Sequence, residues 1–155
     1  GLAALRVGAV IAPHYDLYKK IFNTSLHSST ISGCNVPGQI AATAAMDYCD
    51  EWLTFFVEHL HEMRDNTIER LNLIPGIQCI APEGCYVAWV NIRNTGCNSS
   101  EMQALLMDKA KVAVVPGLKQ WFGDSAEGFI RISFATSAEI VNNALERIHS
   151  TLTNL

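Results

Sequence analysis

The feature that most constrains the fold is a change of rhythm at Pro75 and Gly76. Before this point, from about residue 50 to residue 73, apolar residues recur at every third or fourth position, with acidic residues mostly on the opposite side. This spacing predicts one long amphipathic helix, which the Pro-Gly pair ends. After it the chain breaks into short segments with alternating strand-like and helix-like patterns.

These short segments predict a compact α/β domain. Four strands are predicted, at residues 77–80, 85–92, 112–115 and 129–135. A helix is predicted at 100–111, with Ser100 and Gln103 as a capping box, and a last helix opens with Thr136 and Glu139 in the same roles. The order helix, two strands, helix, two strands, helix indicates an α/β sandwich with a mixed sheet flanked by helices.

The first 49 residues have a different character. Residues 4–12 form a near-continuous apolar run, which predicts a strand buried on both faces. Helices are predicted at 14–22 and 39–46, and the polar stretch 23–38 is of the kind that often lines a site. We therefore predict two parts: residues 1–49, and residues 50–155 with the long helix and the C-terminal domain.

Charge and hydropathy exclude several kinds of partner. The formal net charge is −4 and no block of Lys or Arg is present, so nucleic acid is not expected as a partner. No apolar run reaches the roughly 18 residues that a membrane span needs. The five cysteines show no CxxC spacing, so we expect free, mostly buried thiols in a reducing cytoplasm. His59 and His61 point apart on the predicted helix, which argues against a shared metal.

Two arginines lie within apolar segments: Arg6 in the run 4–12, and Arg131 in the predicted strand 129–135. Burying a guanidinium without a partner is costly, so each arginine should meet an anion. Two interpretations stay open for each. One is structural, a salt bridge to an acidic side chain or a strand end that reaches water, and for Arg131 the nearby acid is Glu127. The other is an anionic small-molecule ligand.

Several segments resemble, in their order and spacing, the class I/II aminotransferases of fold type I, which use pyridoxal phosphate. Residues 1–8 (GLAALRVG) are similar to the segment after the lysine that binds the cofactor, and 35–42 (NVPGQIAA) to a loop and helix near the dimer interface. The other matches are to the start of the small domain (74–77 and 82–89), the loop leading to the substrate (114–117, with Phe122 and Gly123) and the strand whose arginine binds the substrate α-carboxylate (128–135).

The resemblance implies a cytoplasmic, homodimeric enzyme that uses pyridoxal phosphate and acts on amino acids and 2-oxo acids. It assigns the cofactor phosphate to Arg6 and the substrate carboxylate to Arg131, with Asn35, Pro116 and Gly117 lining the active site. It also implies that residues 1–49 are a remnant of the large cofactor-binding domain, and that residues 50–155 are the connecting helix and the small domain.

The same resemblance puts the cofactor-binding lysine upstream of Gly1. No catalytic residue is therefore expected in this chain, and the chain alone is expected to be inactive. None of the five lysines matches the family motif; they are Lys19, Lys20, Lys109, Lys111 and Lys119.

Two other functions stay open at this point. Residues 50–53, 86–89 and 109–114 look like the branch of the family that contains cystathionine β-lyase-like C–S lyases, which carry out β-elimination instead of transamination. Arg6 and residues 131–137 look more like aminotransferases proper. A third reading is a non-catalytic binding or dimerisation module derived from the small domain.

Overall fold

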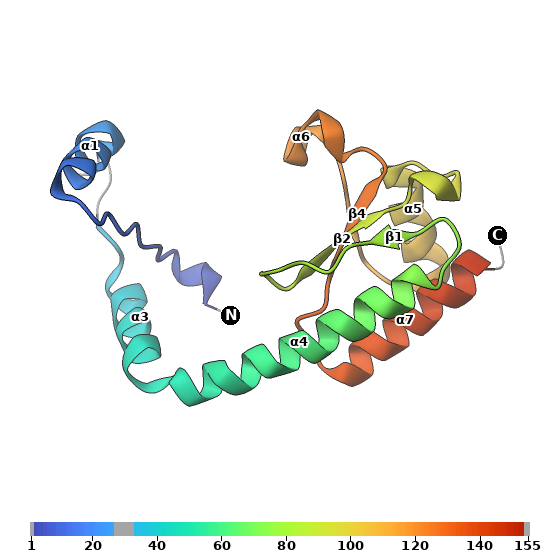
Figure 1. The fold of residues 1–155 in the computed structure, drawn as a ribbon, viewed down its shortest axis with the longest axis horizontal. Coiled ribbons are helices and arrows are strands. Elements are labelled where there is room, and N and C mark those ends of the chain that lie inside the picture. The colour runs from blue at the N-terminus through green and yellow to red at the C-terminus, as the bar shows by residue number, and fades with distance from the viewer. Residues whose placement is uncertain (1, 27–32, 154–155) are drawn as a thin grey trace. The chain divides into compact units, whose positions relative to one another are not determined.

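The computed structural model describes residues 2–26 and 33–153, and it divides into two compact units. The first is Gly1–Thr54 and the second is Phe55–Leu155. Figure 1 labels the elements of both units. The long helix α4 (Asp50–Asn72) begins in the first unit and ends in the second, close to the predicted bounds of 50 and 73.

The first unit is helical in the part that the structure describes. A 3₁₀ turn (Ala3–Leu5) is followed by an irregular segment and then by helices α1 (Tyr15–Ser25) and α3 (Val36–Tyr48). Both helices were predicted, although α3 begins three residues earlier than expected. It does so because Asn35 caps it and proline is favoured in a first helical turn.

The predicted buried strand at 4–12 is wrong. Residues 6–12 have no regular structure, and the side chains of Val10 and Ile11 are 78% and 90% exposed. A strand needs a neighbour that accepts and donates its backbone hydrogen bonds. Among the described residues of the first unit no strand is present, so the apolar run has no ladder to join.

The second unit contains a four-stranded sheet in the order β1-β2-β4-β3. Its strands are β1 (Gln78–Cys79), β2 (Val87–Asn91), β3 (Val115–Pro116) and β4 (Phe129–Ser133). All three pairings are antiparallel. The α/β class and the predicted order of the four strands are confirmed, but the sheet is antiparallel throughout and not mixed.

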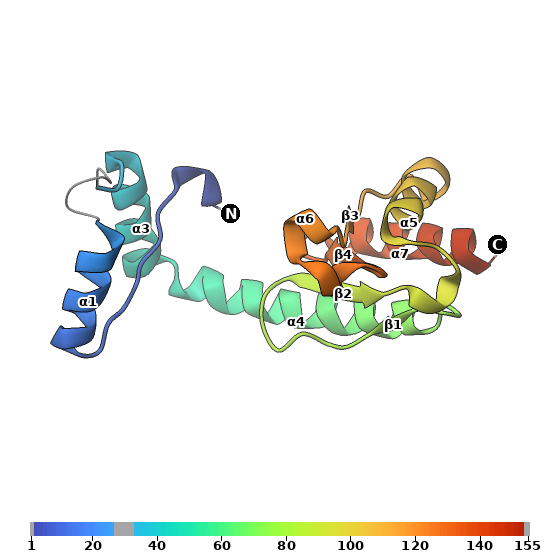
Figure 2. The same cartoon turned by 90° about the horizontal axis from the view of Figure 1, so that it is seen from above.

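Helices cover one face of this sheet. Helices α4 and α7 (Ala138–Thr153) lie side by side along it, and the side chains of Asn66 and Asn142 join them through a 2.9 Å hydrogen bond (Figure 2). The core between sheet and helices is mostly apolar, and the polar residues Thr67 and Ser99 are also buried. Its apolar members include Leu71, Ala88, Val90, Ile92, Met102, Leu106, Ile130, Phe134 and Ile148.

The other face of the sheet is less covered. In β2 the completely buried residues Ala88 and Val90 alternate with the half-buried Val87, Trp89 and Asn91. Successive side chains of a strand point to opposite faces, so Val87, Trp89 and Asn91 lie on the face away from the core. We call this surface the open face of the sheet.

Two helix starts differ from the predicted capping boxes. Helix α5 (Ser99–Leu105) is capped by Asn98, whose side chain accepts from the N–H of Glu101 while the Glu101 carboxylate accepts from the N–H of Asn98. The box is therefore Asn98 and Glu101 in place of Ser100 and Gln103. At α7 the hydroxyl oxygen of Ser137, one residue after the predicted Thr136, accepts from the N–H of Ile140.

The C-terminal part of the predicted helix 100–111 and the loop before β4 also differ from expectation. A π-helical turn (Leu106–Ala110) follows α5, and Lys111 ends it in a left-handed conformation. The short helix α6 (Lys119–Phe122) lies between β3 and β4 and was not predicted. None of the described helices is long and apolar enough to cross a membrane.

Candidate functional site

Arg131 lies at the centre of the open face. Its Cα partners in the sheet are Trp89 of β2 on one side and Val115 of β3 on the other. The carbon of its guanidinium lies 5.7 Å from the centroid of the Phe122 ring, within the range of a cation–π interaction. Among the residues that the structure describes, its side chain has neither an acidic partner nor a hydrogen-bond acceptor. Its N–H groups are available to an external anion.

The expected structural partner of Arg131, Glu127, is used elsewhere. Its carboxylate accepts from the backbone N–H of Ser99 at 2.8 Å and from that of Gly128 at 3.1 Å. These hydrogen bonds, that of Ser99 first, hold the pKa of the Glu127 carboxyl below its ordinary value. Glu127 is therefore a charged brace between β4 and the start of α5, and the interpretation that pairs it with Arg131 is wrong.

A row of three aromatic rings crosses the open face beside Arg131. The Phe129 and Trp89 rings are stacked, with centroids 5.5 Å apart and an interplanar angle of 10°. The Trp89 and Phe122 rings are tilted by 59° with centroids 5.1 Å apart. We call Phe129, Trp89 and Phe122 the aromatic row. Such pairs gain about 0.5–1.5 kcal/mol beyond the area that they bury, so the row should hold its members in fixed positions.

Arg93 lies at the far end of this row. Its guanidinium carbon is 4.6 Å from the centroid of the Phe129 ring. Unlike Arg131, it forms hydrogen bonds with the protein backbone. Its Nε donates to the Glu127 carbonyl, and one terminal nitrogen donates to the Ser125 and Glu127 carbonyls, all at 3.3 Å. Arg93 is thus a structural clamp on the loop before β4.

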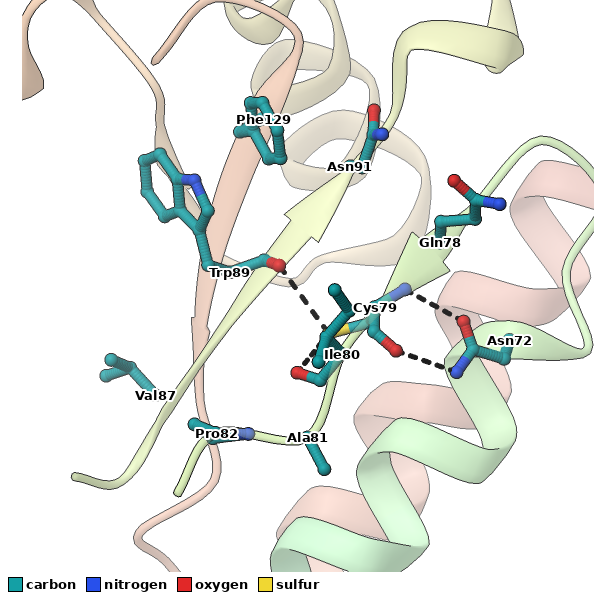
Figure 3. Close-up of a pocket in the computed structure, with 10 residues that line it drawn as sticks. All are labelled: Asn72, Gln78, Cys79, Ile80, Ala81, Pro82, Val87, Trp89, Asn91 and Phe129. Carbon is teal, nitrogen blue, oxygen red and sulfur yellow. Dashed lines mark hydrogen bonds between the residues drawn. The ribbon is translucent and has the colours of Figure 1, made fainter. Parts of the chain in front are cut away.

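A cavity of about 720 Å³ adjoins the aromatic row, and Figure 3 shows the residues that line it. Trp89 and Phe129 form one wall, and Ile80 and Pro82, which follow β1, contribute apolar surface. The lining holds no charged side chain, so the cavity itself suits an apolar group. Arg131, which does not line the cavity, adds a positive charge to the same face of the sheet.

Cys79 in the same cavity is held in place by hydrogen bonds. The side chain of Asn72 donates to the Cys79 carbonyl and accepts from its N–H, at 2.9 and 2.8 Å (Figure 3). Burial raises the pKa of the Cys79 thiol to about 11, so the thiol is neutral near pH 7 and a poor nucleophile. The five cysteines are free as predicted, but the expectation of mostly buried thiols is wrong: only Cys79 is buried, and Cys34 and Cys85 are exposed.

In the first unit, Asn35 is hydrogen-bonded to the residue that precedes Arg6. The Asn35 side chain donates to the carbonyl of Leu5 and accepts from the N–H of Gly38, each at 2.7 Å. Arg6 ends the 3₁₀ turn in a left-handed conformation with φ 54° and is exposed, so the expectation that it is buried is wrong. Like Arg131, it has no acidic partner among the described residues.

Pro116 and Gly117 lie on the edge of the sheet next to β4. Pro116 is completely buried opposite Ile130. The N–H of Gly117 donates to the Phe129 carbonyl at 2.8 Å, and a Cβ atom on Gly117 would lie 2.1 Å from the Ala126 carbonyl oxygen. Both residues therefore fix the loop that leads to α6, and their predicted contact with a ligand stays a prediction.

Residues that could bind a metal are dispersed. Within residues 2–26 and 33–153 no group of three His, Cys, Asp or Glu side chains converges. The Nε2 atom of His59 lies within hydrogen-bond distance, 2.8 Å, of the Thr136 carbonyl oxygen. Three of the lysines are engaged at the surface: Lys109 and Lys111 with Asp108, and Lys119 with Asp124.

The neighbours of Arg131 are not evident from the sequence. Phe122 belongs there to a loop motif, and its contact with the guanidinium appears only in the folded chain. The strand pattern carried part of the signal: Trp89 and Arg131 both occupy outward positions in apolar strands, and such residues meet when the strands pair. The contact of Phe122 depends on the unpredicted helix α6 and left no local signal.

Comparisons with known proteins agree with this geometry. The family model for aminotransferase class I and II matches residues 1–148. An aspartate aminotransferase of Pyrococcus horikoshii is 34% identical over 149 residues, which cover 95% of this chain and 37% of that protein. The cystathionine beta-lyase PatB of Bacillus subtilis is 26% identical over 152 residues, covering 97% of this chain and 38% of the relative.

A solved structure extends the likeness to three dimensions. It is a protein of Clostridium difficile 630 with pyridoxal phosphate bound, provisionally assigned as an aminotransferase; its TM-score is 0.76 at 28% identity, over 92% of this chain and 36% of that one. The chain thus spans little more than a third of the length of the relatives that it matches. It belongs to the class I and II aminotransferase family.

Proposed function

We propose that the enzyme containing this chain is a pyridoxal-phosphate-dependent transaminase of α-amino acids, in which Arg131 binds the substrate α-carboxylate. The observation that carries the proposal is the free N–H edge of Arg131 on the open face. A planar guanidinium donates two parallel hydrogen bonds to a carboxylate, which fixes the orientation of the substrate as well as its charge.

The residues of the first unit fit the cofactor phosphate. Arg6 is exposed and has no acidic partner among the described residues, so its charge is free to bind a phosphate. The hydrogen bonds of Asn35 hold the backbone next to Arg6 against the start of α3. When bound, pyridoxal phosphate supplies an electron sink for the α-carbon of the amino acid. Arg6 would hold the phosphate, and Arg131 would hold the substrate by its carboxylate.

A C–S lyase is the second candidate, because the similarity to cystathionine beta-lyase PatB covers 97% of this chain. Such an enzyme would use the same two arginines but would release a thiol from the β-carbon. Which outcome occurs depends on how protons move at the substrate, and the residues named here serve both reactions equally.

One assay separates the two candidates. The full-length enzyme would be given an amino acid with a 2-oxo acid in one reaction, and cystathionine alone in another. A transaminase converts the 2-oxo acid to its amino acid and leaves cystathionine largely intact. Release of pyruvate and a thiol from cystathionine, without transfer to the 2-oxo acid, would instead identify the lyase.

Other expectations rest on the same proposal. They are that residues 1–49 belong to the large cofactor-binding domain and residues 50–155 to the helix and small domain, and that the chain alone is inactive. A cytoplasmic homodimer and the lining roles of Asn35, Pro116 and Gly117 also stay predictions.

A further inference from the structure

The two arginines on the open face differ in how their N–H groups are used. Both lie against a ring of the aromatic row, Arg93 on Phe129 and Arg131 on Phe122. Arg93 donates to two backbone carbonyls, whereas Arg131 has no acceptor among the described residues. The Arg93 guanidinium therefore fixes the loop before β4 through hydrogen bonds, whereas the Arg131 guanidinium contacts the protein through its face, on the Phe122 ring.

We propose that Phe122 is a positioning residue for Arg131, which it holds through a cation–π contact so that the N–H edge of the guanidinium stays directed at the substrate carboxylate. This inference rests on the proposed function. A free arginine side chain has many rotamers, and fixing one of them before the substrate arrives lowers the entropic cost of binding. An aromatic face restrains the guanidinium without consuming a hydrogen-bond donor.

Phe122 is itself held in place from two directions. Its ring contacts Trp89, and Trp89 stacks on Phe129, which lies diagonally across the β2–β4 pair. Helix α6, which carries Phe122, is closed by the ion pair between Lys119 and Asp124 across its C-terminal turn. The ring that contacts Arg131 is therefore packed against Trp89 on the sheet, on a short helix that an ion pair closes.

The test uses the full-length enzyme with the variants Phe122→Leu and Phe122→Tyr. Leucine keeps an apolar side chain but removes the ring, so the KM for an amino acid should rise about five- to tenfold, the range expected for losing one cation–π contact. Tyrosine keeps the ring and should remain within about twofold of the parent, given that its ring face also binds cations. The kcat should change less than the KM, because the carboxylate contact is made before and during the reaction.

Binding without turnover provides a second readout. The dissociation constant of 3-phenylpropanoate, a carboxylate without an amino group, should rise with Phe122→Leu by a factor similar to that of the KM. Binding of 2-phenylethylamine, which lacks the carboxylate, should be unaffected. Trp121→Leu is the matched control, since Trp121 lies on the same helix and is 59% exposed. An equal effect of Trp121→Leu, or an equal loss for the amine, would mean that helix α6 matters only as a whole and would overturn the proposal.

A double-mutant cycle separates this proposal from the proposed function. In an Arg131→Leu background, Phe122→Leu should have little further effect on the KM, because the group that it positions is absent. If Arg131→Leu itself leaves amino-acid binding unchanged, the assignment of the carboxylate to Arg131 fails. If Arg131→Leu has its full effect and Phe122→Leu has none, only the positioning role fails.

Discussion

At the residue scale, the charges of the second unit fall into two groups. Glu127 and Arg93 form hydrogen bonds with backbone groups around the loop before β4. Ser99, at the start of α5, is completely buried, and its hydroxyl oxygen accepts from the N–H groups of Gly128 and Phe129. Arg131, two residues into β4, has no such role. Arg131 is thus a charged residue without a structural hydrogen bond, on a strand paired on both sides. Such a residue is well placed for contact with a ligand.

The brace formed by Glu127 predicts a dependence of stability on pH. Because the pKa of its carboxyl is lower in the folded chain than in the unfolded chain, its ionised form stabilises the fold above the unfolded pKa of about 4.3. This contribution is lost as the pH falls below that value, through the folded pKa. Urea unfolding of the wild type and Glu127→Gln should therefore differ most near pH 7 and converge in acid. Glu69→Gln, on the exposed side of α4, reports the effect of removing a surface charge. A difference between wild type and Glu127→Gln that grows in acid would contradict the brace.

At the element scale, the second unit could largely be read from the sequence. The long helix and three of the four strands are apolar patterns that local spacing encodes, and their order follows directly. Strand β3 is reduced to Val115–Pro116, because only these two residues pair with β4, opposite Arg131 and Ile130, and residues 112–114 join no ladder. The antiparallel pairing and the helix α6 depend on contacts between distant segments, which spacing along the chain does not record.

The strand predicted at 4–12 shows what an apolar pattern alone cannot predict. Apolar composition indicates that a segment should be buried, but it does not supply the neighbouring strand. The two arginines were found because charge in an apolar segment is conspicuous, yet only Arg131 lies on a strand. Its aromatic neighbours required the fold.

The start of α5 gives a test at this scale. Asn98→Ala removes the side chain that accepts from the N–H of Glu101, and should lower the free energy of unfolding by about 1 kcal/mol. Ser100→Ala, at the position that the sequence pattern favoured, should change it by a few tenths of a kcal/mol at most, because Ser100 is exposed inside the helix. Chemical denaturation of both variants measures the difference. A larger loss with Ser100→Ala would mean that the helix begins two residues later.

At the scale of the whole molecule, the two units differ in how much they bury. The second has a continuous apolar core, whereas Gly38 is the one fully buried residue among those described in the first. The first unit exposes large apolar side chains, among them Val10, Ile11, Tyr15, Ile40 and Tyr48. Surfaces of this kind mark places where a protein is normally covered. The low content of charged residues, 17%, agrees with that reading.

The 155-residue chain should not bind pyridoxal phosphate covalently. Lys109, Lys111 and Lys119 pair with acids at the surface, and none of the five lysines lies in a segment that resembles the family's lysine motif. Incubation with the cofactor and reduction with borohydride should leave no single pyridoxyl-lysine, as read by peptide mass spectrometry. A stoichiometric adduct at one lysine, such as Lys119, would contradict the expectation that the chain alone is inactive.

The most direct test of the function proposed for Arg131 compares two substrates in the full-length enzyme. Replacing it by lysine removes the two parallel hydrogen bonds to a carboxylate while keeping the charge. Losing a charge-assisted contact whose partner stays desolvated costs roughly 2–5 kcal/mol, so kcat/KM for an amino acid should fall about a hundredfold or more. For an amine that has the same side chain but no carboxylate, kcat/KM should change little. Equal losses for the two substrates would make Arg131 a structural residue and would put the carboxylate site elsewhere.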